Sequence, residues 1–225
     1  MAGDAGDSRG RAAGPPLSAN RWLSSRSDGG DDYDRRLAER PTTGPGVHGE
    51  ADLVAALAPA TVLDAGCGSG RVAIGLARRG VEAVGVDIDP EMLGTARRKA
   101  PGLTWIEADL ATVTVAGEQG KLRTFEAVVL AGNVMIFLTP GTEGAVIANL
   151  ARHLVPGGAL LAGFQLQPGR LDLATYDRHC AAAGLRLEGR WATWERDPWQ
   201  PGGDYAVSLH RLSWPRLGGG HPAQL

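Results

Sequence analysis

The hydrophobic positions of this chain follow two spacings that alternate along most of its length. Mostly apolar runs without a regular alternation, which favour strands, occupy residues 61–66, 81–87, 103–110, 125–133 and 159–166. Segments that favour helices occupy residues 31–40, 48–59, 71–80, 89–100, 140–154 and 171–184. Apolar strands without alternation, separated by helices, are typical of a parallel sheet that is covered on both faces. We therefore predict a doubly wound α/β fold.

The end of the chain departs from this pattern. Residues 185–195 and 203–212 both have an extended pattern, and a turn-rich stretch without a helix joins them. Parallel neighbours need a long crossover, so we expect these two segments to pair antiparallel. If the first of them is parallel to the rest of the sheet, the loop that follows it projects from the same edge as the strand-to-helix turns.

Composition divides the chain into one domain with two tails. Residues 1–30 are rich in Gly, Ala, Ser and Asp and have almost no aliphatic period, so we expect them to be disordered. Residues 214–225 are expected to form a flexible C-terminal tail. A hydrophobic content of 43% in 225 residues suits one globular domain, which we place at residues 31–213.

Charge and cysteine content narrow the class of protein. The formal net charge is −2 and the pI is about 6.2, so the chain lacks the basic excess that nucleic-acid binding normally requires. Cys67 and Cys180 cannot form a framework of several disulfides, which favours a reduced cytoplasm. No apolar run reaches the roughly 18 residues that span a bilayer, and no export signal is recognisable. The acidic residues show no spacing typical of metal ligands.

Three alternating glycines follow the first predicted strand, in the stretch VLDAGCGSGR. They stand at positions 66, 68 and 70, and Asp64 adds negative charge beside them. The dinucleotide fingerprint G-x-G-x-x-G requires a glycine where this chain has Arg71, and no Gly-Lys-Ser/Thr follows for phosphate binding. Ligands bind at the carboxyl edge of such sheets, where this turn lies. The pattern therefore predicts a ligand-binding turn that is not built for a pyrophosphate.

Carboxylates at the ends of the next two strands suggest what the ligand is. Asp87 ends the second strand and can accept hydrogen bonds from both hydroxyls of a ribose. Asp109 ends the third strand and can hold the amino group of an adenine beside the backbone of Ala108 and Leu110; alternatively, it caps the stretch that follows. Ile88 offers an apolar surface for the adenine face. No basic side chain is dedicated to phosphate, so these features suit a cationic adenosine derivative.

These motifs, in this order, resemble the class I S-adenosylmethionine-dependent methyltransferases, in the form of the generic small-molecule methyltransferase domain. VLDAGCGSG is similar to the family's first motif, VGVDIDPEML to its second, IEADL to its third, and FEAVVLAGN and LVPGGALLAGF to its fourth and fifth. The resemblance covers residues 62–164 and implies S-adenosylmethionine as cofactor and a seven-stranded sheet with an antiparallel last strand. It also implies the residues that hold the cofactor: Asp64, Gly66, Gly68 and Gly70 around the methionine, Asp87 at the ribose, Asp109 at the adenine, and Ala131 near the methionine amino group.

Two residues are candidates for contact with the methyl acceptor. Asn133 follows the fourth strand, at the edge that is expected to face the methyl group. Adenine and glutamine amino methyltransferases carry Asn/Asp-Pro-Pro-aromatic here, whereas Val-Met-Ile follows Asn133, which argues against nucleobase amines and favours a small hydrophobic acceptor. His48 is a candidate base or substrate contact, and it fits equally a surface histidine that helps to cap a helix.

The loop between the last two extended segments contains Trp194, Asp197 and Trp199. We interpret them as part of a substrate lid or, alternatively, as packing at the sheet edge. The function predicted from all these features is methyl transfer to a small-molecule acceptor at O, N or C. Two other functions stay open: a protein that binds S-adenosylmethionine without catalysis, and an RNA or protein methyltransferase.

Overall fold

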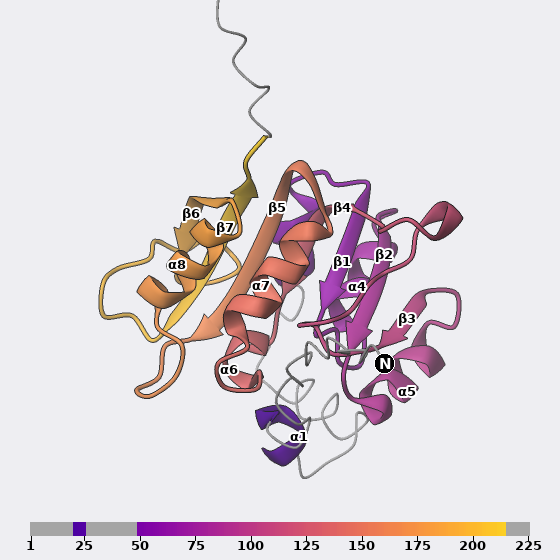
Figure 1. The fold of residues 1–225 in the computed structure, drawn as a ribbon, viewed down its shortest axis with the longest axis horizontal. Coiled ribbons are helices and arrows are strands. Elements are labelled where there is room, and N and C mark those ends of the chain that lie inside the picture. Colours follow the sequence, from indigo (N-terminus) through magenta and orange to yellow (C-terminus); the bar gives the residue numbers. More distant parts are fainter. Residues whose placement is uncertain (1–19, 26–48, 215–225) are drawn as a thin grey trace, which may run out of the picture.

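The computed structural model describes residues 20–25 and 49–214, which include one seven-stranded sheet with the order β3-β2-β1-β4-β5-β7-β6 (Figure 1). The strands are β1 (Thr61–Ala65), β2 (Glu82–Asp87), β3 (Thr104–Glu107), β4 (Phe125–Leu130), β5 (Leu154–Gln165), β6 (Leu185–Trp191) and β7 (Tyr205–Leu212). β7 pairs antiparallel with β5 and with β6, and all the other pairs are parallel. The predicted fold, including the antiparallel last strand, is confirmed. β6 is therefore parallel to β5, and the loop after it lies at the carboxyl edge.

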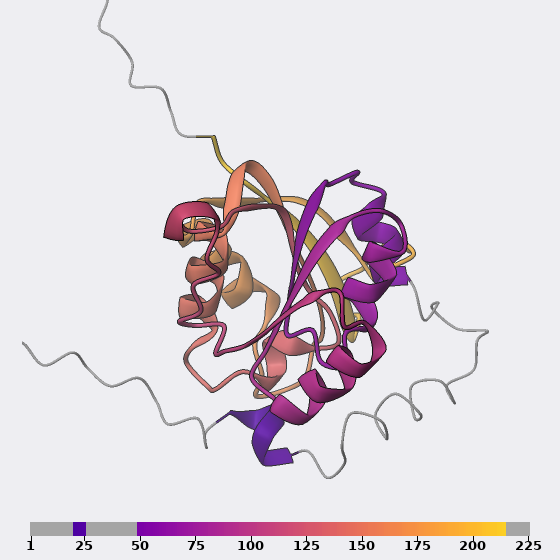
Figure 2. The ribbon, with the colours of Figure 1, turned by 90° about the vertical axis from the view of Figure 1, so that its right-hand side faces the viewer.

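Helices cover both faces of the sheet, as the view along its edge shows (Figure 2). Those on one face are α3 (Gly49–Ala55), α4 (Arg71–Ala77) and α5 (Pro90–Lys99), and those on the other are α6 (Val134–Phe137), α7 (Glu143–Arg152) and α8 (Leu173–Ala182). A short 3₁₀ turn, η2 (Glu118–Gly120), precedes β4. The strand order reverses between β1 and β4, so the crevice where ligands bind in this class opens at the carboxyl ends of these two strands.

The unbroken apolar strands reflect burial on both faces of the sheet. Side chains of successive β4 residues point to opposite faces, so Val128 belongs to the core under α6, α7 and α8, and Val129 to the core under α3 and α4. Both valines are fully buried. A strand that must fill two cores cannot alternate apolar with polar residues, which is why its sequence reads as one apolar run.

β5 begins at Leu154, five residues earlier than the predicted strand at residues 159–166. The Pro-Gly-Gly sequence that we expected to end the preceding helix lies inside the strand instead. Phe125 of β4 pairs with Leu154 and Ala127 pairs with Ala159, so the register shifts at this point. An irregularity of this kind absorbs extra residues while the strand continues on both sides of it.

The N-terminal part of the chain also differs from the prediction. Within residues 1–30, which we expected to be disordered, Arg21–Ser25 form a short helix, α1, that packs against α6 at the carboxyl edge of the sheet (Figure 1). Asn20 caps this helix, because its Oδ1 accepts hydrogen bonds from the backbone N–H groups of Trp22 and Leu23. The helix predicted at residues 31–40 lies outside the described residues, as do the remainder of the first tail and residues 215–225.

The described part of the chain contains neither a helix that could span a membrane nor a cluster of metal-binding side chains. Among residues 20–25 and 49–214, no helix is long and apolar enough to cross a membrane. The same residues bring together no group of three or more His, Cys, Asp or Glu side chains that could hold a metal ion.

Candidate functional site

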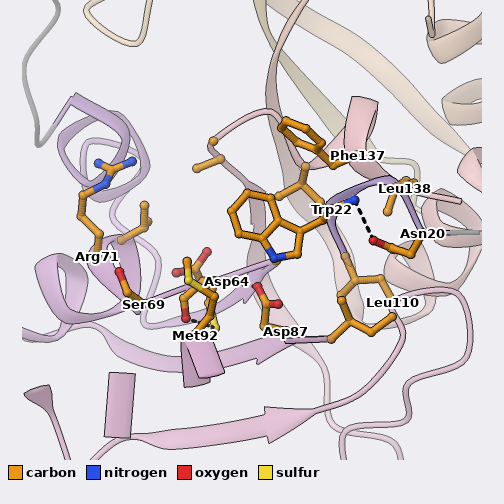
Figure 3. A pocket seen from close by; sticks show the side chains of 18 of the residues that line it. Asn20, Trp22, Asp64, Ser69, Arg71, Asp87, Met92, Leu110, Phe137 and Leu138 are labelled. Atoms are coloured by element: carbon orange, nitrogen blue, oxygen red, sulfur yellow. Dashed lines mark hydrogen bonds between the residues drawn. The ribbon is translucent and has the colours of Figure 1, made fainter. Parts of the chain in front are cut away.

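A pocket opens at the carboxyl ends of β1, β2 and β4, where the strand order reverses. Its lining comes from the glycine turn after β1, from the ends of β2 and β4, and from α6 and α1 (Figure 3). Of the predicted cofactor residues, the pocket brings together eight: Asp64, Gly66, Gly68, Asp87, Ile88, Asp109, Leu110 and Ala131. The sequence motifs therefore meet in one cavity.

The glycine turn brings backbone close to α6. Gly66 has a φ of +78°, and its N–H donates to the carbonyl of Val86 at 2.8 Å. A Cβ at position 66 would overlap the Val134 side chain, with the Cγ1 atom only 2.9 Å away. A residue with a side chain thus fits neither the backbone conformation nor the space.

Gly70, also predicted to contact the cofactor, is not among the residues that line the pocket. A Cβ at this position would lie 2.5 Å from the Cη2 atom of Trp105. The third glycine therefore makes room for the Trp105 ring against the start of α4, which is a packing role.

Asp87 connects the end of β2 to the glycine turn. Its Oδ2 accepts a hydrogen bond from the Gly68 N–H at 2.7 Å, and its Oδ1 accepts one from the Asp89 N–H at 2.9 Å. Burial raises the pKa of the Asp87 carboxyl, and these two backbone hydrogen bonds oppose that shift. Each carboxylate oxygen has a second lone pair, so Asp87 can also accept hydrogen bonds from a ligand.

Asp64 is the last residue but one of β1, near its carboxyl end, and is buried. Its Oδ2 accepts a hydrogen bond from the Ala73 N–H in the first turn of α4 at 2.9 Å. Burial is the largest influence on this carboxyl and raises its pKa to about 7, while the Ala73 hydrogen bond and the charge of Arg71 oppose the shift.

The substitution Asp64→Asn is expected to remove part of the pH dependence of stability. Because the pKa of Asp64 is raised from 3.8 to about 7 on folding, the native state holds a proton that the unfolded state releases. The resulting stabilisation is complete below pH 3.8 and is lost as the pH rises through 7, with a loss on the order of 1 kcal/mol between pH 6 and pH 8. Chemical denaturation at both pH values should show a steeper fall for the wild type. An equal fall in both proteins would contradict the shifted pKa.

The predicted adenine side is only partly as expected. Asp109, Ile88 and Leu110 line the pocket, whereas Ala108 does not. The Ala108 N–H donates to the carbonyl of Asp87 at 2.9 Å. Asp109 Oδ1 accepts a hydrogen bond from the Ala111 N–H at 2.8 Å. Asp109 therefore caps the stretch that follows it, and it also lines the pocket.

Of the two candidates for acceptor contact, only Asn133 lies among the described residues, and it is not part of this lining. Asn133 has a φ of +68°, and its Oδ1 accepts a hydrogen bond from the Gln165 N–H at 2.8 Å, which connects the turn after β4 to the end of β5. This contact gives Asn133 a structural role at the carboxyl edge. His48 lies outside the described residues.

The two tryptophans among the predicted lid residues lie on opposite faces of the sheet. Trp194 is 7% exposed in the core under α3 and α4, and its Nε1 donates to the Tyr205 hydroxyl at 3.0 Å. The Trp199 ring instead lies under the guanidinium of Arg190, which binds Asp177 of α8 on the opposite face. Neither tryptophan lines the pocket. Both side chains pack against the sheet, and their assignment to a substrate lid stays a prediction.

Asp197 is exposed and bonds within its own loop, where its Oδ2 accepts from the Thr193 hydroxyl at 2.9 Å. It does not line the pocket either. This contact holds the turn that connects the two tryptophans.

Sequence reasoning missed Asn20, Trp22 and Phe137, which all line the pocket. The sequence ANRWLSS carries one signal for the first two, an Asn at a helix N-cap position. Five helical residues are too few for an apolar period to appear. Phe137 comes directly after the Val-Met-Ile sequence that favours a hydrophobic acceptor.

The charges that line the pocket favour a cationic ligand. Asp64, Asp87 and Asp109 all contribute to the lining. The Arg71 guanidinium forms a bidentate pair with Glu50, with N–O distances of 2.5 and 2.7 Å. A pyrophosphate would therefore meet more negative than positive charge. S-adenosylmethionine, with its sulfonium and ammonium groups, fits these residues better.

The reversal of strand order, the glycine turn and the strand-end carboxylates define a class I methyltransferase fold and site. The family described as "Methyltransferase domain" matches residues 62–158. An uncharacterized methyltransferase of Mycobacterium tuberculosis is 30% identical over 166 residues, which cover 72% of this chain and 78% of the relative. The chain belongs to the class I S-adenosylmethionine-dependent methyltransferases, a family whose cofactor is S-adenosylmethionine.

Solved structures agree with this assignment. A TehB-like SAM-dependent methyltransferase of Corynebacterium glutamicum is 30% identical, with a TM-score of 0.73 over 82% of this chain and 98% of that one.

Some relatives match over a shorter part of their sequence. The trans-aconitate 2-methyltransferase of Methylobacterium nodulans is 36% identical over 115 residues, 49% of this chain and 41% of the relative. The match therefore spans less than half of the length of this relative, and it spans 30% of the ribosomal protein L11 methyltransferase of Dechloromonas aromatica.

Proposed function

We propose that this protein transfers the methyl group of S-adenosylmethionine to a small, largely apolar acceptor. One observation carries the proposal: the glycine turn, the strand-end carboxylates and an apolar wall line the same pocket. The wall consists of Val134, Phe137 and Leu138, from α6 and the residue after it. These side chains offer an acceptor apolar contact beside Ala131 and the glycine turn, where the predicted methionine contacts lie.

The residues of the chain contribute mainly by positioning. The cofactor supplies an activated methyl group on its sulfonium. The apolar wall orients the acceptor and excludes water, and correct alignment of two bound reactants removes a large part of the barrier. An amine acceptor is already nucleophilic, so alignment suffices for it, whereas an alcohol also needs a base.

The names of relatives support a small-molecule acceptor without selecting one. Besides the trans-aconitate methyltransferase, a dTDP-3-amino-3,4,6-trideoxy-alpha-D-glucopyranose N,N-dimethyltransferase of Streptomyces venezuelae is 30% identical over 143 residues. One name specifies a carboxylic acid and the other an amino sugar nucleotide. The acceptor must therefore be found by experiment.

Labelled cofactor is expected to transfer its methyl group to one or a few small metabolites. The test incubates the full chain with methyl-labelled S-adenosylmethionine and a fractionated extract of its host, and then locates the label. The variant Asp87→Asn, which lacks the ribose carboxylate, serves as the control for background transfer. Label in the protein or RNA fraction would indicate a macromolecular acceptor instead. No S-adenosylhomocysteine from any fraction would indicate a protein that binds the cofactor without catalysis.

A further inference from the structure

The short helix α1 contributes a pocket wall from a part of the chain that the methyltransferase motifs do not include. Two contacts hold its first turn in place. Asn20, only 7% exposed, caps the first turn, and Nη1 of Arg21 lies 3.4 Å from the carbonyl oxygen of Ile136 in α6. α1 is therefore docked on the same helix that carries the apolar wall.

Trp22 projects from α1 into the pocket. Figure 3 shows its indole near the centre of the cavity, with Phe137 on one side and Asp87 on the other. The indole and the Phe137 ring meet edge to face, with centroids 5.7 Å apart and an angle of 79° between the rings. Aromatic pairs favour this arrangement, which fixes the side of the indole that faces α6.

A hydrogen bond to Asp89 fixes the other side of the indole. Trp22 Nε1 donates to Asp89 Oδ2 at 2.9 Å. Asp89 is fully buried and also caps α5, because its Oδ1 accepts from the Glu91 N–H at 3.0 Å. The helix cap holds the carboxylate still, so it is a rigid acceptor for the indole.

Asp89 connects Trp22 to the predicted ribose contact. The Asp89 N–H donates to Asp87 Oδ1 at 2.9 Å, and Asp87 Oδ2 accepts from the Gly68 N–H at 2.7 Å. Consecutive hydrogen bonds thus run from α1 through Asp89 and Asp87 to the glycine turn. The position of the indole is set relative to the carboxylate that would receive the ribose hydroxyls.

We propose that Trp22 is a binding residue for the adenosyl cofactor, with its indole closing the ribose end of the pocket and Asp89 holding the indole in place. The inference rests on the cofactor site described above. An aromatic plane beside the sugar supplies apolar contact and keeps water from the Asp87 carboxylate, which strengthens the hydrogen bonds made to it. Phe137, on the far side of the indole, belongs to the wall assigned to the acceptor. Trp22 therefore also separates the acceptor part of the pocket from the ribose end at Asp87.

Two variants of the full chain test this role, with S-adenosylhomocysteine as the probe and calorimetry as the measurement. Trp22→Ala removes the wall and its apolar contact with the sugar, and it is expected to weaken binding about tenfold. Trp22→Phe keeps a ring against Phe137 but lacks the N–H that Asp89 accepts, and a loss of about threefold is expected. Saturating probe should also change the tryptophan emission of the wild type, and this change should be largely absent in Trp22→Phe.

Trp214→Phe is the matched control. Trp214 is 74% exposed and lies against Gly157 at the opposite edge of the sheet, so this variant should bind the probe as the wild type does and keep the change in emission. Trp22→Phe keeps the test decisive if Trp22→Ala does not fold.

Three results would overturn the proposal. The first is unchanged affinity in both Trp22 variants, and the second is a change in emission that persists in Trp22→Phe. The third is tighter binding by Trp22→Ala, because the indole would then occupy the place of the ligand.

The variant Asp87→Asn distinguishes a wrong role for Trp22 from a wrong assignment of the cofactor site. If Asp87→Asn loses binding while both Trp22 variants keep it, only the role of Trp22 is wrong; if Asp87→Asn also binds normally, the cofactor site is wrong.

Discussion

Replacement of Asp87 by asparagine is expected to weaken the binding of S-adenosylhomocysteine by at least about a hundredfold. The carboxylate can receive both ribose hydroxyls, and hydrogen bonds to an ionised acceptor are the stronger kind, each contributing about 1.5–3 kcal/mol. The same two oxygens accept from the backbone N–H groups of Gly68 and Asp89. An amide has only one oxygen, so in Asp87→Asn an NH₂ group faces one of these donors, and the turn loses its alignment as well.

Calorimetry measures this effect, and Glu118→Gln provides a control with the same chemical change. Glu118 is exposed in η2, before β4 and outside the pocket. That variant should bind as the wild type does. Wild-type affinity in Asp87→Asn, with the fold intact by circular dichroism, would show that the ligand does not use this carboxylate.

The substitution Gly66→Ala is expected to lower the free energy of unfolding by about 3 kcal/mol and to impair cofactor binding. A left-handed backbone costs a residue with a Cβ about 1–2 kcal/mol, and overpacking adds about 1–3 kcal/mol. The overlap falls on Val134, so relief of the clash must move α6 and with it the wall of the pocket. Chemical denaturation gives the stability change, and titration with the probe gives the change in binding.

Gly80→Ala separates the cost of the left-handed backbone from the cost of the overlap with Val134. Gly80 has nearly the same backbone, with a φ of +81°, but a Cβ there would meet nothing within 4 Å. It should lose only the conformational part, about 1 kcal/mol. The double variant Gly66→Ala/Val134→Ala should be less destabilised than the sum of its single changes, because the smaller side chain removes the overlap. Equal losses in Gly66→Ala and Gly80→Ala, with additive behaviour of the double variant, would show that contact with α6 does not matter.

The part of the site that could be predicted from sequence is the part that local backbone geometry builds. The glycine turn follows a buried strand directly, and Asp87 and Asp109 come at or just after the ends of the next two strands. In a parallel sheet the carboxyl ends of strands meet at one edge, so position along the chain is enough to place these residues together. The pocket contains all three groups, as expected.

Residues whose role depends on what packs against them could not be assigned in this way. Asn133 has the right position in the sequence for a contact with the acceptor, yet its amide oxygen is bonded to the backbone of Gln165, 32 residues away. Trp194 and Trp199 lie five residues apart in one loop but face opposite sides of the sheet. Their side-chain directions follow from contacts with Tyr205 and Arg190, which no local pattern reveals.

Local patterns were enough to predict the doubly wound fold, the antiparallel end of the sheet and the strand-end residues of the pocket, because periodic burial and strand-to-helix turns are local properties of the chain. No local pattern shows that α1 covers the pocket or that Trp22 contacts Asp89, a residue 67 positions away, because these contacts form only between packed elements. Five helical residues are too few to show a period, and a helix this short is stable only through its packing. The energy that orders α1 comes from residues on α5 and α6, and such contacts appear only when the chain is folded.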